Sequence, residues 1–476
     1  MVVGVLVIVG VVMFSPENLG QTGRWVSPVE RHNAEIEAVA MEDRAYPILA
    51  KFMARDSRGE GQFEHLDVMP GDEGWDELAA WIHDPRTQEL IELLARASEC
   101  SILGMPMLDY EDSIWVDAMA EVGIWLEEPT VYEDEPACLI LNVLLPMGGA
   151  IIRAEWYLQA DALLAIEQRD MDRFVRDVRI WSKLAMFADE PKIAVGQLVQ
   201  AVQLAKISLF IADVLLEHPE LVDVAVAGDL DEILAGAMAA DVFVFDLELE
   251  YATLEDVIRR MVDDAGQYAP AQTLAFIPMI DDGEGILPEP SWARIEDIDA
   301  DLLAGYMHYK AVGQSRVDAV GMPWREVEAL EEDDWGKDIV SPQGEIGKLM
   351  YPILTLGDEQ LDSAVSMLRT YHQQMIGVRV AIAGHRHRLR HGDPAVGLSD
   401  IDSDLMWFDP VDGFTGGPVQ YRWREGRMLV YAVGADGDDD GGVEVVRPEG
   451  VEGFLISDEY LREGWDGDMV LFPVSD

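Results

Sequence analysis

The sequence predicts a mainly α-helical protein, built as an array of antiparallel helical hairpins, with a small antiparallel β module at its C-terminal end. Apolar residues recur at helical spacing through most of the chain from Ser27 onward, so that each segment has one face to bury. Beyond Pro394 the pattern changes to short β-type runs separated by turn residues. The chain has 476 residues, 49% of them hydrophobic, which is enough to bury a substantial core.

The chain begins with an apolar segment. Residues 2–14 read VVGVLVIVGVVMF and carry no charge, but the run is shorter than the roughly 20 residues that span a bilayer. No basic residue precedes it to set an orientation. A membrane anchor, a signal core and a buried strand of a soluble protein all fit this pattern. We favour the membrane-related interpretations, assign residues 1–16 to an anchor or signal core, and expect an extracytoplasmic location in the cell envelope.

Residues 24–394 are assigned to one α-helical domain. Its first helix is expected to begin after Ser27, with Pro28 at the first helical position, and Pro47 should kink or divide it. Because a proline cannot continue a helix interior, the next helices form a short pair joined at Pro85. Short helices are therefore expected at 76–84, 85–99 and 110–123.

The clearest helical array spans residues 136–238. Polar breaks at 168–172 (QRDMD) and 188–192 (ADEPK) separate its helices, which indicates packed antiparallel hairpins. No fixed repeat period is present, so a tetratricopeptide-like array is disfavoured. The predicted core stripes of two successive helices are Phe174, Val178, Trp181 and Leu184, followed by Leu198, Val202, Ala205, Leu209, Ala212 and Leu216.

Further helices are expected at 244–265, 291–312 and 358–391. The last of these ends in the basic run HRHRLRH before a glycine and a proline, which opposes the negative end of the helix dipole and stops the helix. It should pack along most of its length. Its predicted stripe is Leu361, Val365, Leu368, Tyr371, Met375, Val378, Ile382 and Leu389.

Residues 395–476 are assigned to the β module. Two strand-like runs, 419–423 (VQYRW) and 427–433 (RMLVYAV), flank the turn residues Glu425 and Gly426, which predicts a hairpin. A third strand is expected at 469–474 (MVLFPV).

Charge limits the choice of partners. The 91 acidic residues outnumber the 34 Lys and Arg residues, and a formal charge of −57 excludes nucleic acid as an expected partner. Such a surface repels itself and is relieved by salt or by divalent ions. Cys100 and Cys138 are the only cysteines, too few for a disulfide framework or a thiolate metal site.

The loop at 434–442 reads GADGDDDGG. Asp436, Asp438 and Asp440 alternate in it, as ligands do in the first half of an EF-hand. The second half of the loop does not match an EF-hand, because Arg447 occupies the position where an EF-hand requires glutamate. Carboxylates held on one turn still repel one another unless a cation bridges them, and calcium is the natural choice. A solvated, glycine-rich turn is the alternative.

From Ile382 to its end the chain resembles the C-terminal part of type II secretion major pseudopilins. The resemblance is carried, in order, by AIAGHRHRLRHGDP, FDPVDGFTGGPVQYRW, LVYAVGADGDDDGG and WDGDMVLF. It implies a calcium site in which Asp436 is a ligand, Asp466 and Asp468 supply distant carboxylates, and backbone carbonyls near Val433 complete the shell.

The rest of the chain departs from that family. The early phenylalanine and glutamate of a pseudopilin are missing, a long helical domain comes first, and residues 443–464 are inserted between the loop and Asp466. The polymer-forming role is therefore not expected. The whole layout resembles large bacterial proteins with an N-terminal membrane segment, a helical body and this tail, a group without an assigned activity.

Three histidines near the end of the last helix raise the question of a zinc site. His387 and His391 are four residues apart and share a helix face, as zinc ligands do. No third ligand is evident nearby, and the interleaved arginines would repel a dication, so these residues and His385 are interpreted as a basic helix end.

No catalytic residue is assigned, because nucleophile elbows, P-loops, HExxH and dinucleotide fingerprints are all absent from the sequence. We expect a membrane-anchored, extracytoplasmic structural or interaction protein with a calcium-stabilised module, a membrane contact through its N-terminus, and protein partners that the sequence does not identify. The alternative is a soluble, salt-adapted enzyme of a hydrolase-like kind, with its site between helical hairpins.

Overall fold

The computed structural model describes residues 28–56, 70–106, 146–190, 192–239, 345–434, 437–443 and 467–473. In these residues the protein is mainly α-helical, with one small three-stranded antiparallel sheet near the C-terminus, which confirms the predicted fold class. Several predictions fall outside the described residues: the apolar segment 1–16, the helices at 110–123, 244–265 and 291–312, Cys138, and the candidate ligands Asp436 and Asp466.

The N-terminal helices are short and are set by prolines. The chain divides before Pro47, which occupies the first turn of its helix, where the missing N–H has no partner to lose. Asp84 caps the helix that starts at Pro85, because its Oδ1 accepts a hydrogen bond from the backbone N of Arg86 at 2.8 Å. The elements are α1 (Pro28–Glu37), η2 (Met41–Asp43), α2 (Tyr46–Arg55), α3 (Trp75–Ile82) and α4 (Pro85–Ser98).

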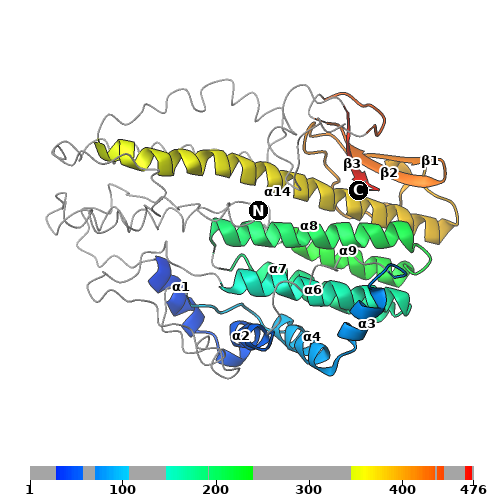
Figure 1. Cartoon of the computed structure of the whole chain (residues 1–476). Helices are drawn as coiled ribbons and strands as arrows, with labels where there is room; N and C mark the ends of the chain where they lie inside the picture. The colour runs from blue at the N-terminus through cyan, green and yellow to red at the C-terminus, as the bar shows by residue number, and fades with distance from the viewer. Residues whose placement is uncertain are drawn as a thin grey trace, which may run out of the picture.

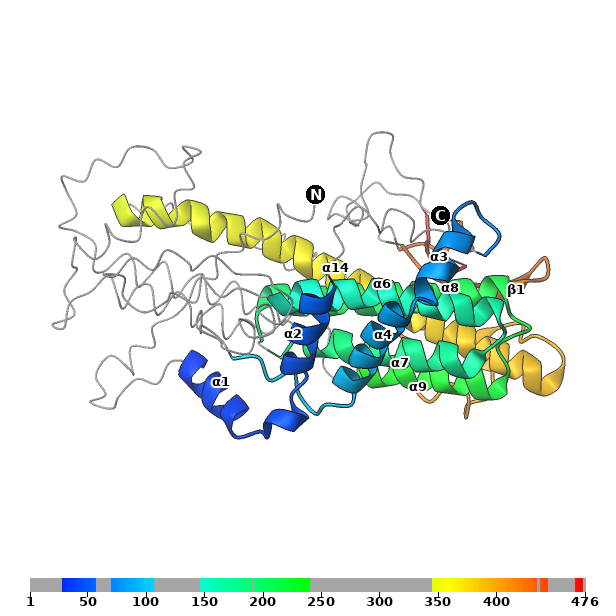
Figure 2. The same ribbon diagram turned by 60° about the horizontal axis from the view of Figure 1, so that its bottom comes forward.

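Four longer helices form the centre of the body: α6 (Pro146–Glu167), α7 (Met171–Phe187), α8 (Ala194–Glu217) and α9 (Val224–Met238). Their breaks fall where the sequence predicts. Asp170 caps α7, and Asp223 caps α9 by accepting hydrogen bonds from the N–H groups of Ala225 and Val226. These helices lie side by side in Figures 1 and 2, with α7 in contact with α6, α8 and α9.

The predicted stripe of α7 is buried along its whole length, but that of α8 is only partly correct. Val202, Leu209 and Leu216 are half-buried, because α8 packs against α7 on one side and against the long helix α14 (Glu345–His391) on the other. Its fully buried apolar positions include Leu204, Ile207, Ile211 and Val214. Within the described residues, one helix segment, Val195–Glu217, is long and apolar enough to cross a membrane, and 72% of its most apolar window is buried inside the protein.

Helix α14 is longer than predicted and connects the body to the sheet. It contacts α8 and α9 and also β2 (Arg427–Ala432) and β3 (Met469–Phe472), as Figure 1 shows. Leu368, Met375, Val378 and Ile382 of the predicted stripe are buried. Leu389 is 41% exposed, contrary to the prediction, because the last turn of α14 extends beyond α8 and α9 (Figure 2).

The predicted hairpin is β1 (Gln420–Arg424) and β2, and β3 adds to the free side of β2, so the strand order is β1-β2-β3, all antiparallel. Glu425 and Gly426 form the turn with φ values of 51° and 83°, as a type I′ turn requires. The sheet lies very close to α14, since a Cβ placed on Gly377 would come within 2.2 Å of the Leu471 Cβ. One hydrophobic core runs from Ala45 in the body to Phe472 in the sheet.

Candidate metal centre in the acidic loop

The acidic loop follows β2, and the sheet fixes one of its carboxylates. Asp439 Oδ2 accepts a hydrogen bond from Arg422 on β1 at 2.7 Å, and Oδ1 accepts from the Tyr431 hydroxyl on β2 at 2.9 Å. Oδ1 also accepts from the backbone N of Gly441 at 2.9 Å. Partial burial opposes ionisation of Asp439, but these donors hold its pKa below the usual range. Asp439, which was not among the predicted ligands, therefore serves to shape the loop.

Asp468 joins the loop to the last strand. It directly precedes β3 and is fully buried, and its Oδ2 accepts a hydrogen bond from the backbone N of Gly442 at 2.6 Å. The backbone N of Asp468 donates in turn to the carbonyl oxygen of Val443 at 2.7 Å. Two hydrogen bonds, one to the Asp468 side chain and one from its backbone N–H, therefore hold the loop against the residue that precedes β3.

The electrostatic environment of Asp468 is unfavourable for an ionised carboxylate. Burial, with added repulsion from Asp439 and Asp440, raises the pKa of Asp468 to about 6. Its second oxygen, Oδ1, is buried and has no hydrogen-bond partner among the described residues, although the backbone N–H groups of Gly442 and Asp440 near the carboxylate oppose the rise in pKa. A buried carboxylate oxygen without a donor is costly, and a bound cation would remove that cost. The donor set at this point therefore fits a hard metal ion.

The structure brings Asp440 and Asp468, two of the five predicted metal ligands, close enough together for their charges to repel. Asp440 is half-buried, whereas Asp438 is exposed in the same loop. Asp436 and Asp466 remain predictions, because they lie outside the described residues.

Asp412 is a buried carboxylate that the sequence analysis missed. Its Oδ1 accepts hydrogen bonds from the backbone N of Phe414 at 2.7 Å and of Thr415 at 3.2 Å, and its Oδ2 accepts from the backbone N of Val433 at 2.8 Å. Burial nevertheless raises the pKa of Asp412. Its role is to hold the turn before β1 against the end of β2, where the acidic loop begins. The sequence signal for this role was the segment FDPVDGFTGG, which is rich in turn-forming residues and contains Asp412.

The histidines at the end of α14 have different roles. His385 is buried, and its Nε2 donates a hydrogen bond to the carbonyl oxygen of Val222 at 2.7 Å. Burial lowers the pKa of His385, although its hydrogen bond to Val222 opposes that shift. His387 and His391 instead lie beside Asp402, which follows the short helix η6 (Leu398–Asp400).

A cavity of about 530 Å³ lies between α4, α7 and α9, in the position that the alternative enzyme hypothesis would require. Arg176 and Arg179 line it, but Arg176 pairs with the buried Asp161 and Asp177, and Arg179 pairs with Asp229. Burial and the neighbouring charge of Asp161 raise the pKa of Asp177. Since both arginines are already paired with carboxylates, the cavity gives no reason to assign a reaction.

No protein-family model, curated protein or solved structure matches this chain. By its fold and its site, the protein is a helical body with a small β module that carries an acidic loop.

Proposed function

We propose that this is a membrane-anchored, extracytoplasmic structural or interaction protein whose C-terminal module is stabilised by calcium. The observation that carries the calcium part is the buried carboxylate of Asp468, which faces the acidic loop with one oxygen that has no hydrogen-bond donor among the described residues. The order of motifs shared with the pseudopilin tail supports the same assignment.

The proposed ligands are Asp440 and Asp468, together with the predicted Asp436, Asp438 and Asp466. Calcium suits this set because it takes six to eight oxygen ligands in a flexible geometry, and the proposed side chains offer only carboxylates. When bound, the ion supplies the positive charge that offsets repulsion between the loop and Asp468. The chain's own contribution is to hold the loop in place through Asp439 and Gly442.

The anchoring part of the proposal rests on the uncharged segment 2–14. We expect the full-length chain, expressed in bacteria with its N-terminus intact, to sediment with membranes and to resist extraction with carbonate. A chain that begins at Ser27 is the matched control and should stay in the soluble fraction. A full-length chain that is freely soluble would favour the alternative of a soluble, salt-adapted enzyme.

Calcium is expected to raise the melting temperature of the whole chain, and Asp468→Asn should abolish this shift. A ligand at about 100 times its dissociation constant stabilises the folded state by about 2.7 kcal/mol. Thermal melts in calcium and in chelator, at constant high sodium chloride, measure the effect. In chelator at neutral pH, Asp468→Asn should be at least as stable as the wild type, because it removes a buried charge.

The matched control is Asp229→Asn, which removes a charge from the exposed surface of α9 and should keep the full calcium shift.

The calcium-induced rise in melting temperature should also grow as the pH rises through about 6. The raised pKa of Asp468 makes the ion-free protein lose stability over that range, while calcium keeps the carboxylate ionised. Equal shifts in the wild type and Asp468→Asn would instead indicate general screening of the acidic surface and would contradict the proposed site.

A further inference from the structure

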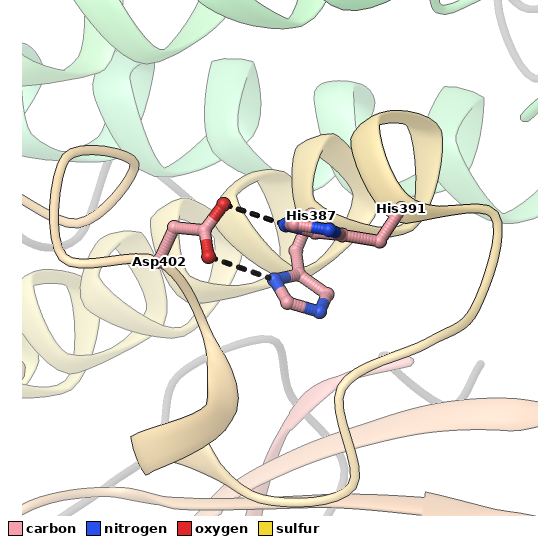
Figure 3. A group of neighbouring side chains, drawn as sticks. All are labelled: His387, His391 and Asp402. Carbon is pink, nitrogen blue, oxygen red and sulfur yellow. Dashed lines mark hydrogen bonds and ion pairs between the residues drawn. The ribbon is translucent and has the colours of Figure 1, made fainter.

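The last turn of α14 and the segment after η6 bring two histidines and a carboxylate together. His387 and His391 are one helical turn apart, with ring centroids separated by 4.4 Å. Asp402 turns toward both of them, as Figure 3 shows. One nitrogen of each histidine and an oxygen of Asp402 lie within 4.8 Å of one another.

The sequence analysis set aside a zinc site here because no third ligand was evident. The fold supplies that ligand in Asp402, whose Oδ2 lies 2.8 Å from His391 Nε2 and whose Oδ1 lies 3.8 Å from His387 Nδ1. Zinc binds imidazole nitrogen and carboxylate oxygen at about 2.0–2.2 Å, which places the ligand atoms of a tetrahedral site roughly 3.3 Å apart. The observed separations bracket that value, so small side-chain rotations would complete the coordination.

A second observation concerns the buried nitrogen of His387. The His387 side chain is only 12% exposed, and its Nδ1 is buried without a hydrogen-bond partner among the described residues. The separation of 3.8 Å from Asp402 is too long for a hydrogen bond. A buried ring nitrogen that faces a carboxylate without bonding to it is the arrangement that a bridging metal ion would satisfy.

The neighbouring arginines repel a dication at this site less than their positions in the sequence indicate, because each of them has another partner. Arg386 is directed toward Asp231, at 3.8 Å, and Arg388 lies over the ring of Trp423. Arg390 does contact Asp402, but it also makes hydrogen bonds to both carboxylate oxygens of Asp404 at 2.9 and 3.0 Å, which offset its charge.

We propose that His387, His391 and Asp402 form a binding site for a zinc ion, with a solvent water as the fourth ligand. His391 is 46% exposed and Asp402 is 28% exposed, so the site has an open side from which ion and water can enter. The ion would link the end of α14 to the segment that leads to the sheet. The site shares no residue with the proposed calcium site and does not depend on it.

The test is a calorimetric titration of the zinc-free, full-length protein with zinc chloride, in a buffer that contains excess calcium to occupy the acidic loop. The wild type should bind one equivalent of zinc. His391→Ala and Asp402→Asn should each weaken binding by at least about tenfold, since even residues that only support metal ligands contribute that much. His83→Ala removes an exposed histidine at the end of α3 and should leave the affinity unchanged.

Cobalt(II) gives a second readout, because a tetrahedral site with nitrogen ligands produces an intense visible absorption that His387→Ala should remove. Circular dichroism checks that each variant remains folded. If His387→Ala does not fold, the loss of cobalt absorption is measured in His391→Ala, which alters a half-exposed surface side chain. The proposal is overturned if the wild type binds no zinc, or if the variants bind it as tightly as the wild type.

Discussion

Asp231→Ala is expected to lower the free energy of unfolding by about 3–5 kcal/mol, because it leaves a buried cation without its partner. Asp231 lies on α9 and is 3% exposed, and its Oδ1 accepts a hydrogen bond from Arg379 of α14 at 2.8 Å. Its Oδ2 accepts from the Trp407 indole at 3.1 Å. Arg379 is 2% exposed and also packs on the ring of Phe408. Asp231 thus joins three segments that are distant in sequence.

Urea unfolding of the wild type and the variant measures this loss. Asp229→Ala is the matched control on the same helix, because its ion pair with Arg179 is exposed and should contribute less than about 1 kcal/mol. The double variant Asp231→Leu with Arg379→Met should recover much of the loss, since it removes both buried charges. Similar effects for Asp231→Ala and Asp229→Ala would show that the buried cluster is not what joins α14 to α9.

Gly377→Ala is expected to destabilise the protein by about 1–3 kcal/mol, even though alanine favours a helix by about 1 kcal/mol over glycine. The added Cβ would lie 2.2 Å from the Cβ of Leu471 on β3, which is too short for a real contact, so helix and strand would have to move apart. Because β3 directly follows Asp468, we also expect weaker calcium stabilisation in this variant.

Chemical denaturation with and without calcium measures both effects. Gly236→Ala on α9 is the control, since a Cβ there meets nothing within 4 Å and the position is exposed. It should stabilise the protein by up to about 1 kcal/mol. A stabilising effect of Gly377→Ala would mean that α14 and β3 do not pack as closely in solution as the structure has them.

The sequence alone predicted the elements whose ends depend on neighbouring residues. Asp84 and Asp170 cap helices that begin where the periodicity begins, and Pro47 sits in the first turn of its helix. Glu425 and Gly426 fix the hairpin turn. These features are local, because a cap, a proline or a turn acts on the backbone within a few residues.

The sequence analysis was less successful where a helix has more than one neighbour. The apolar positions of α8 were read as one stripe, but the helix is covered by both α7 and α14, so its burial extends around most of its surface. At Leu389 the opposite holds, since the covering helices end before the last turn of α14. Periodicity gives the faces of a helix but not the number of its partners.

The amino-acid sequence determined the helices, the hairpin and the acidic character of the loop, because each follows from the order of adjacent side chains. Tertiary structure decided which group each of three carboxylates meets: Asp468 the backbone N–H of Gly442 in the loop, Asp402 the ring of His391, and Asp231 the guanidinium of Arg379. Each pair joins residues from different segments: the pairing of β3 with β2 brings Asp468 to the loop, and the packing of α14 against α9 brings Arg379 to Asp231.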